Sequence, residues 1–294
     1  MDNTGFSFQP SWQQLLNDEP AFLKHIGDAL QRSAADADLP VGPSIRSVQA
    51  SAVLFLLGCS CSPSGRATAE PCLILNKRSA KVRQPGDLCC PGGSIAPRLD
   101  PLLAVLLRLP GSPLLRWEHW PALHRRQPLQ SRKLALLFAT GLRESAEEMR
   151  LNPLGVKLLG PLQPENLVMF QRTIYPLVCW VSKQKRFFPN WEVERIVSIP
   201  IRELLDPSRY VRFRLRIDVP AASARVNGTR NFACFLHHRR DGRTDRLWGA
   251  TFRITMEFLD VVFGFHPPPL ESLPTVEGKI DENYINPNAS VIGR

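Results

Sequence analysis

The chain has 294 residues, of which 44% are hydrophobic and 22% charged, and it carries a formal net charge of +10. This composition is ordinary for a folded globular protein with a sizeable core. The longest apolar runs, at residues 52–57 and 102–107, are far too short to cross a bilayer, which excludes a membrane-spanning protein.

The seven cysteines indicate a reducing compartment. Their number is odd, and neither Cys59 with Cys61 nor the adjacent Cys89 and Cys90 has the spacing of a disulfide scaffold or a structural zinc site. The first residues lack the basic region and apolar core of a signal peptide. We therefore expect a cytoplasmic protein with reduced thiols and no membrane partner.

The N-terminal part of the chain predicts a peripheral helix followed by two strands. Residues 1–40 carry apolar side chains at roughly helical spacing, which indicates a helical extension packed on the main domain or docked on a partner. Residues 47–57 and 72–75 are rich in apolar residues. A loop of small and polar residues joins them, so we expect the two strands to be neighbours in a sheet.

The middle of the chain predicts an irregular insertion followed by a long helix. Residues 97–130 combine prolines, a leucine cluster and two tryptophans without lasting periodicity, which indicates a surface excursion. Whether it covers a site as a lid or projects away stays open, and its Leu and Trp content keeps a partner surface or a homodimer contact as alternatives. Ser131 is expected to cap a helix over residues 132–150, which Asn152-Pro153 ends.

The C-terminal half mixes strands and helices. The expected strands lie at residues 173–181, 196–199, 211–219 and 231–236, and the expected helices at 201–205 and 248–263. Residues 267–294 are rich in proline and polar residues, so we expect an extended or disordered tail. The mixture, without internal repeats, predicts an α/β (α+β) protein with one main domain at residues 45–266.

Arginine alternates with apolar residues in one predicted strand, at Arg212, Arg214 and Arg216. Alternation with a period of two predicts a half-exposed strand with arginine on its wet face. That face is either merely solvated or directed toward phosphate or nucleic acid. No known nucleic-acid-binding motif accompanies the charge, so we do not expect a nucleic-acid partner.

Three carboxylates, Glu144, Glu147 and Glu148, stand at i, i+3 and i+4 in the predicted long helix. This spacing places them on one face, where their charges repel each other. Either the face is simply solvated or a divalent cation binds there, since Mg²⁺ prefers hard oxygen ligands. The chain is therefore a candidate metal-dependent hydrolase acting on a phosphate-containing substrate.

The residues around this cluster resemble the Nudix hydrolases. Gly93 and the run Arg143-Glu144-Ser145-Ala146-Glu147-Glu148 are similar to the Nudix box of that family. Residues 78–93, which end in Pro91-Gly92-Gly93, look like the second motif of its coenzyme A diphosphatase branch. Two further segments of that branch resemble residues 189–205 and 247–251, and the four ordered matches span residues 47–265.

The chain also departs from the family pattern. Between Gly93 and Arg143 lie 49 residues where the box has 13, so an insertion of 36 residues interrupts it. Counting back from Arg143 places the first glutamate of the box at Ala135, which indicates that it is absent, and Asp100 is a poor substitute by position. Arg150 stands where the box has a late glycine.

The resemblance implies a Nudix-type α/β/α sandwich with a mixed sheet and the hydrolysis of a pyrophosphate linkage in a nucleoside diphosphate derivative. Coenzyme A or its thioesters are the leading small-molecule substrate. It further implies Mg²⁺ or Mn²⁺ as cofactor, held by Glu144, Glu147 and Glu148. Such cations offset the negative charge that develops on the substrate and lower the pKa of a bound water.

The resemblance also implies roles for other residues. Glu144, or Glu192 from a later loop, would orient the attacking water, and Arg143 would orient Glu147 through an i,i+4 ion pair. These assignments make Glu144, Glu147, Glu192 and Arg143 the catalytic candidates.

Substrate binding is expected from the segment before the insertion. Gly92 and Gly93 lack side chains, so their backbone N–H groups could approach phosphate closely. Arg78 and Arg83 would contact the phosphates of the substrate. The alternative to an enzyme is a catalytically degenerate Nudix-like module that binds a nucleotide, a protein or RNA, which the missing glutamate and the insertion favour.

Overall fold

The computed structural model describes residues 9–36, 50–60, 70–167, 172–217, 228–280 and Tyr284. Its larger sheet has the order β3-β2-β1-β7-β5, with β4 also on β1, β6 on β7 and β8 on β2. Strand β1 (Ala50–Ser60) runs parallel to β7 (Arg172–Val181) and antiparallel to β2 (Glu70–Arg78). The sheet is therefore mixed, and the expected α/β class is confirmed.

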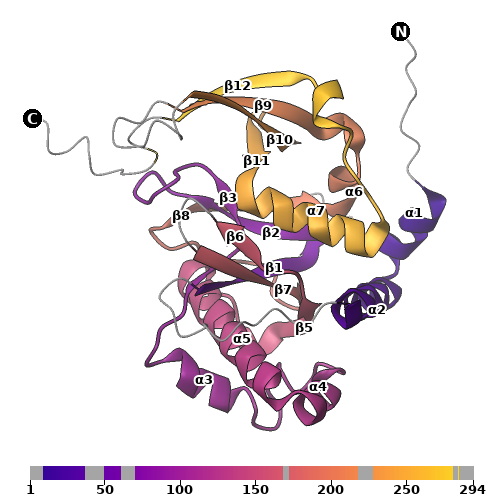
Figure 1. Ribbon diagram of the computed structural model, residues 1–294, viewed down its shortest axis with the longest axis vertical. Helices are drawn as coiled ribbons and strands as arrows, with labels where there is room; N and C mark the ends of the chain where they lie inside the picture. Colours follow the sequence, from indigo (N-terminus) through magenta and orange to yellow (C-terminus); the bar gives the residue numbers. More distant parts are fainter. Residues whose placement is uncertain are drawn as a thin grey trace, which may run out of the picture.

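Both faces of this sheet are buried, as the uninterrupted apolar run of β1 requires. Val53, Phe55 and Leu57 point into one core with helices α2 (Glu19–Asp36) and α7 (Gly249–Phe263). Leu54 and Leu56 point into a second core beneath α5 (Pro128–Met149). Figure 1 shows α3, α4 and α5 on one side of the sheet and α7 on the other.

The remaining elements of this layer connect these parts. They are α1 (Pro10–Asn17), β3 (Leu88–Cys89), β4 (Gly92–Ser94), α3 (Asp100–Leu106), α4 (Trp120–Arg126), β5 (Val156–Pro161), β6 (Glu165–Leu167), β8 (Val193–Pro200) and α6 (Ile201–Leu204). The N-terminal helices lie on the main body, because Phe22 packs edge-on against Trp180 at 6.2 Å between ring centroids.

A second sheet has the order β11-β10-β9-β12. Its strands are β11 (Thr244–Leu247), β10 (Gly228–His238), β9 (Tyr210–Ile217) and β12 (Thr275–Ile280). The expected antiparallel pair is present, because Phe213 of β9 lies opposite Phe232 of β10. Strand β12 runs parallel to β9, so this stretch of the expected extended or disordered tail is extended and is paired in a sheet. Edge pairing with β9 orders it despite its polar composition.

Helix α5 begins earlier than the sequence predicts. Pro128 occupies the first helical position, where a fixed φ and a missing N–H are tolerated, and the preceding Gln127 makes no side-chain cap. Ser131 is therefore not the N-cap. It is buried inside the first turn, where its Oγ donates to the carbonyl oxygen of Pro128 at 2.9 Å.

The insertion at residues 97–130 is not a loose excursion. It folds into α3 and α4, and Leu114, Trp117 and Trp120 are buried in the core beneath α5. The indole N–H of Trp117 donates to the carbonyl oxygen of Leu159 at 3.1 Å, which ties the insertion to β5. The insertion therefore extends the layer that carries the glutamates.

Candidate active site

Glu148 lies at the C-terminal end of α5 between two strands of the sheet. Its Oε2 accepts a hydrogen bond from Nδ2 of Asn76 in β2 at 2.8 Å and another from the backbone N–H of Gly92 in β4 at 3.1 Å. Asn76 is only 1% exposed, and its Oδ1 has no hydrogen-bond partner among the described residues. A buried carbonyl oxygen without a partner is costly unless a ligand or water completes it.

The electrostatics of Glu148 show that carboxylates distant in sequence come together here. Burial, together with the negative charges of Glu144 and Glu192, raises the pKa of Glu148 to about 8, against the backbone N–H of Gly92 and the charge of Arg78, which lower it. The structure thus brings Glu192 of the later loop to the helix, as the sequence suggests. Like charges in one partly buried place favour a bound cation.

Glu144 faces the glycine pair. A Cβ built on Gly93 would lie 2.5 Å from Cδ of Glu144, so a side chain there would displace this carboxylate. Burial, Glu147 and Asp100 raise the pKa of Glu144, while Arg143 lowers it. Gly92 meets a different limit, because it has a φ of +143° and its Cβ would lie 2.3 Å from the carbonyl oxygen of Ala52. The backbone therefore requires glycine at position 92, and glycine at position 93 leaves Glu144 where it lies.

Arg143 joins the carboxylates to one another. Its guanidinium contacts Oε1 of Glu144 at 3.0 Å and Oε1 of Glu147 at 3.4 Å, the latter being the i,i+4 pair expected from the sequence. It also donates to the carbonyl oxygen of Ser94 at 3.0 Å. Glu147 remains 57% exposed at its side chain, so it lies on the open side of the cluster.

Asp100, which sequence position alone made a poor substitute for the missing glutamate, is the main partner of Arg143. Its carboxylate accepts from Nε of Arg143 at 2.7 Å, and from Thr140 and the backbone of Ala96, with no exposed surface. This pairing raises the pKa of Arg143 above its ordinary value. Counting back from Arg143 does not reach Asp100, because most of the insertion lies between these two residues. The count reaches Ala135 instead, which is a core residue of α5.

The loop that carries Glu192 closes the end of α5. The N–H groups of Phe188 and Asn190 donate to the carbonyl oxygens of Met149 and Glu148, at 3.0 and 2.8 Å. These carbonyls have no partner inside the helix, so the loop satisfies them and is positioned by them. The N–H of Glu192 donates to Oδ1 of Asn190 at 2.9 Å, which fixes the turn before the carboxylate.

Arg150 ends α5 in the left-handed conformation, with a φ of 53°. Its N–H donates to the carbonyl oxygen of Ala146, and that of Leu151 to the carbonyl oxygen of Ser145. This is the helix ending that glycine adopts without strain. The arginine therefore preserves the geometry of the glycine expected at this position, at a conformational cost.

The two predicted phosphate-binding arginines lie differently. Nε of Arg78 donates to the carbonyl oxygen of Arg83 at 2.7 Å, and the charge of Arg78 lowers the pKa of Glu148, so Arg78 stands beside the carboxylates. The side chain of Arg83 is exposed, and only its backbone carbonyl takes part in this contact. The structure therefore brings only Arg78 to the cluster.

Asp87 fastens the loop between these arginines and the glycines to the second sheet. It accepts from the indole N–H of Trp248 at 3.0 Å and from the hydroxyl of Tyr284. The N–H of Arg78 donates to the carbonyl oxygen of Asp87 at 2.9 Å. Sequence analysis missed Asp87, Tyr284 and Asn76, although Asp87 and Trp248 both lie in segments that resemble the family.

The donor set suits a hard divalent cation. Carboxylates from two elements converge, and the orphan Oδ1 of Asn76 lies on the residue that holds Glu148. Among the described residues, no three His, Cys, Asp or Glu side chains are already close enough to form a metal site. Glu144, Glu147 and Glu148 would have to draw together around the ion. No helix in the described part of the chain is long and apolar enough to cross a membrane.

Comparison with known proteins places these observations beside a family. No protein-family model matches the chain. A curated protein of Pectobacterium atrosepticum, named "Uncharacterized Nudix hydrolase NudL", is 29% identical over 176 residues, which cover 58% of this chain and 69% of the relative. This relative supports a place for the chain in the Nudix hydrolase superfamily.

Solved structures give weaker likenesses. A Nudix hydrolase from Alicyclobacillus acidocaldarius has a TM-score of 0.34 and 16% identity, over 54% of this chain and 82% of that one. A Nudix hydrolase from Nitrosomonas europaea has a TM-score of 0.32 and 10% identity, over 78% and 79% of the two chains. At these scores the structures add no argument about the site.

Proposed function

Because the chain is related to a Nudix hydrolase, we propose that it is a metal-dependent hydrolase that cleaves a pyrophosphate linkage in a nucleoside diphosphate derivative. One observation carries the proposal. Glu144, Glu148 and Glu192 converge beside Arg143 and the glycine pair, close enough for the charges of Glu144 and Glu192 to raise the pKa of Glu148. Nothing in the packing of the helix requires three carboxylates in that place.

Mg²⁺ or Mn²⁺ would supply Lewis-acid activation and charge compensation for a diphosphate. Glu148 is the candidate ligand with the firmest geometry, because Asn76 and Gly92 both bind its Oε2 and, as far as the described residues go, leave Oε1 for a ligand. Glu144 and the more exposed Glu147 would complete the carboxylate set.

Glu192 and Glu144 are the candidates to accept the proton of the attacking water. A general base must lie within hydrogen-bond reach of that water, and both carboxylates border the same cluster as Glu148. Arg143 acts as a positioning residue for Glu144, since it holds Glu144 and Glu147 through one guanidinium that Asp100 fixes from behind.

Coenzyme A or its thioesters are the substrate that we propose within this class, on the resemblance of residues 78–93, 189–205 and 247–251 to the coenzyme A diphosphatase branch. Arg78 would meet a phosphate next to the carboxylates, and Arg83 would meet one farther out. We further propose residues 45–266, extended by β12, as the catalytic domain of a cytoplasmic enzyme.

The test is product release from coenzyme A with and without Mg²⁺ or Mn²⁺. We expect metal-dependent release by the wild type and a loss of at least about 100-fold in Glu148→Gln and Glu147→Gln. Glu118→Gln, which removes a carboxylate that is 72% exposed on the insertion, is the matched control and should keep full activity. Metal-dependent turnover that survives both site variants would overturn the assignment.

Metal affinity gives a second readout. Because Asn76 orients Glu148, Asn76→Leu should weaken Mn²⁺ binding by roughly 10- to 100-fold, measured by electron paramagnetic resonance of free Mn²⁺. Ser208→Ala, in a surface turn with no contact to the cluster, should bind like the wild type.

A catalytically degenerate binding module is the second candidate, favoured by the absence of a preformed metal site among the described residues. Such a module would bind a nucleotide without forming product. An RNA-binding form of it would lose affinity steeply as salt is raised. Turnover of coenzyme A or of any member of a nucleotide panel would reject this candidate.

A further inference from the structure

Helix α3 and its flanks expose a row of large apolar side chains. Nine large hydrophobic side chains are exposed in the described part of the chain, and five of them belong to this short stretch. Leu102 is the most exposed of the five at 64%. The row consists of Leu99, Leu102, Val105, Leu106 and Leu109, and we call it the α3 apolar row.

The fold itself gives no reason for this row. The opposite face of α3 already anchors the helix, through Asp100 on Arg143 and through Ala104 in the core beneath α5. The five exposed side chains could be polar without loss of these contacts. A contiguous exposed apolar surface of this kind marks an interaction site.

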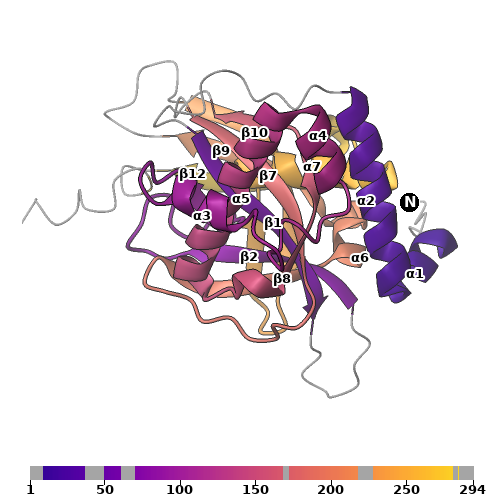
Figure 2. The same ribbon diagram turned by 90° about the horizontal axis from the view of Figure 1, so that it is seen from below.

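Positive charge surrounds the row. Residues 97–133 contain six Arg and one Lys against two acidic residues, one of which is the buried Asp100. Arg98 and Arg108 border the row at its two ends, and the exposed Arg125 and Arg126 lie on α4. None of these four arginines forms an ion pair with any residue that the structure describes. Viewed from below, α3 and α4 lie on the same face of the molecule (Figure 2).

This combination selects the kind of partner. A second copy of the chain would bring the same basic face against itself, and like charges would oppose the contact. An anionic lipid surface instead takes up apolar side chains into its boundary layer while its headgroups pair with arginine. We propose that the α3 apolar row and its four arginines dock the protein on the surface of an anionic phospholipid membrane.

The docked helix would be directly linked to the candidate site. Asp100, on the buried face of α3, binds the guanidinium that holds Glu144 and Glu147. The α3 apolar row therefore lies on one face of this short helix, and the residue that contacts Arg143 lies on the other. Such docking requires no spanning segment, but it replaces the expectation of no membrane partner.

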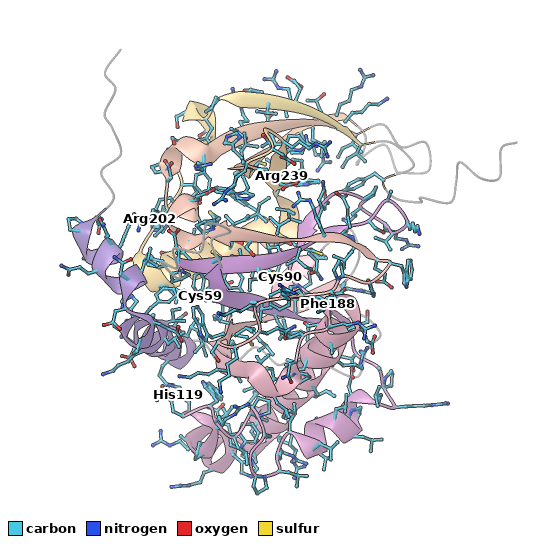
Figure 3. The ribbon with its side chains drawn as sticks, turned by 180° about the vertical axis from the view of Figure 1, so that it is seen from behind. Cys59, Cys90, His119, Phe188, Arg202 and Arg239 are labelled. Atoms are coloured by element: carbon cyan, nitrogen blue, oxygen red, sulfur yellow. The ribbon has the colours of Figure 1, made fainter. Side chains whose placement is uncertain are left out.

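The test is co-sedimentation of the full chain with vesicles of phosphatidylcholine alone or with roughly 30 mol% phosphatidylglycerol. Leu102→Asp/Leu106→Asp removes the centre of the row, and Arg98→Gln/Arg108→Gln removes its flanking charge. Arg240→Gln/Arg243→Gln is the matched control, because it removes two exposed arginines from the β10–β11 turn. Figure 3 shows Arg239, at the start of that turn, well away from His119 of the insertion.

We expect the wild type and the control to bind only the anionic vesicles, and each test variant to bind at least about tenfold more weakly. Unchanged thermal unfolding would show that both test variants fold. Wild-type protein that stays in the supernatant, or binding that the leucine variant leaves intact, would overturn the proposal. Concentration-dependent dimers that the leucine variant abolishes, without vesicle binding, would assign the row to a second copy instead.

Discussion

The contact between Asp100 and Arg143 makes a quantitative prediction about stability. Asp100→Asn keeps the shape of the side chain but removes its charge and replaces one acceptor oxygen by a donor. Asp100 has no exposed surface, and the side chain of Arg143 is only 11% exposed, so water cannot take over the lost bonds. Breaking one side of a buried ion pair costs about 3–5 kcal/mol.

Arg143 keeps Glu144 and Glu147 as partners after this substitution, so we expect the lower end of that range, about 3 kcal/mol. With a urea dependence of about 3 kcal/mol per molar, the unfolding midpoint should fall by about 1 M. The assay is urea unfolding followed by tryptophan fluorescence. Metal-dependent turnover at low urea should also fall, because the guanidinium no longer holds Glu144 in one place.

The matched control is Asp260→Asn, which removes the carboxylate of an exposed pair with His266. Exposed pairs contribute little, so its free energy of unfolding should stay within about 0.5 kcal/mol of the wild type and its midpoint should hardly move. An Asp100→Asn midpoint equally close to the wild type would refute the reasoning. It would mean that the ion pair does not help to hold α3 on α5.

Three further predictions follow from the same cluster. Gly93→Ala should displace the Glu144 carboxylate and lower metal-dependent turnover at least about tenfold in a folded protein, whereas Gly27→Ala, with its nearest atom at 3.6 Å, should not. The folded-state pKa of Glu148, about 8, lies above its unfolded value, so the metal-free protein binds more protons when it is folded. The free energy of unfolding should therefore fall from about pH 5 to pH 8 and then level off. Unfolding titrations should show this slope weakened in Glu148→Gln, and an equal slope in that variant would contradict the assignment. Arg150→Gly should raise the free energy of unfolding by up to about 1 kcal/mol, since glycine adopts the left-handed conformation without strain, and a lower melting temperature would count against that account.

The sequence alone predicts that three carboxylates share one face of a helix, because this prediction needs only residues that are close together in the chain. The spacing of Glu144, Glu147 and Glu148 follows from the helical period alone, and the segment with Glu192 was recognisable as a motif. The contact between Asp100 and Arg143 could not be predicted, because the two residues are 43 positions apart. The insertion between them has a fold that its composition does not predict. Counting back from Arg143 assumes that the whole insertion precedes the first acidic residue of the box. Most of residues 97–130 instead follow Asp100.

Asn76 and Asp87 illustrate a second limit. Asn76 directly follows the strand predicted at residues 72–75, but its contact with Glu148 depends on how that strand lies beneath the helix. Asp87 meets Trp248 and Tyr284, which come from the far end of the chain. The pattern of a single sequence does not show which distant segments pair. For the same reason β12, which pairs with β9, was predicted as part of a tail.

The hydrogen bonds from Trp248 and Tyr284 to Asp87 limit when the candidate site can form during synthesis of the chain. The loop with Arg78 and Asp87 leaves the ribosome first, and the two groups that hold Asp87 are made 161 and 197 residues after it. Strand β1 likewise waits for β7, more than a hundred residues later, before its parallel ladder can form. A nascent chain that stops before Trp248 would carry Glu144, Glu147, Glu148 and Glu192 without the contacts that fix the loop of Arg78, so this part of the candidate site is completed only after Tyr284 has been made.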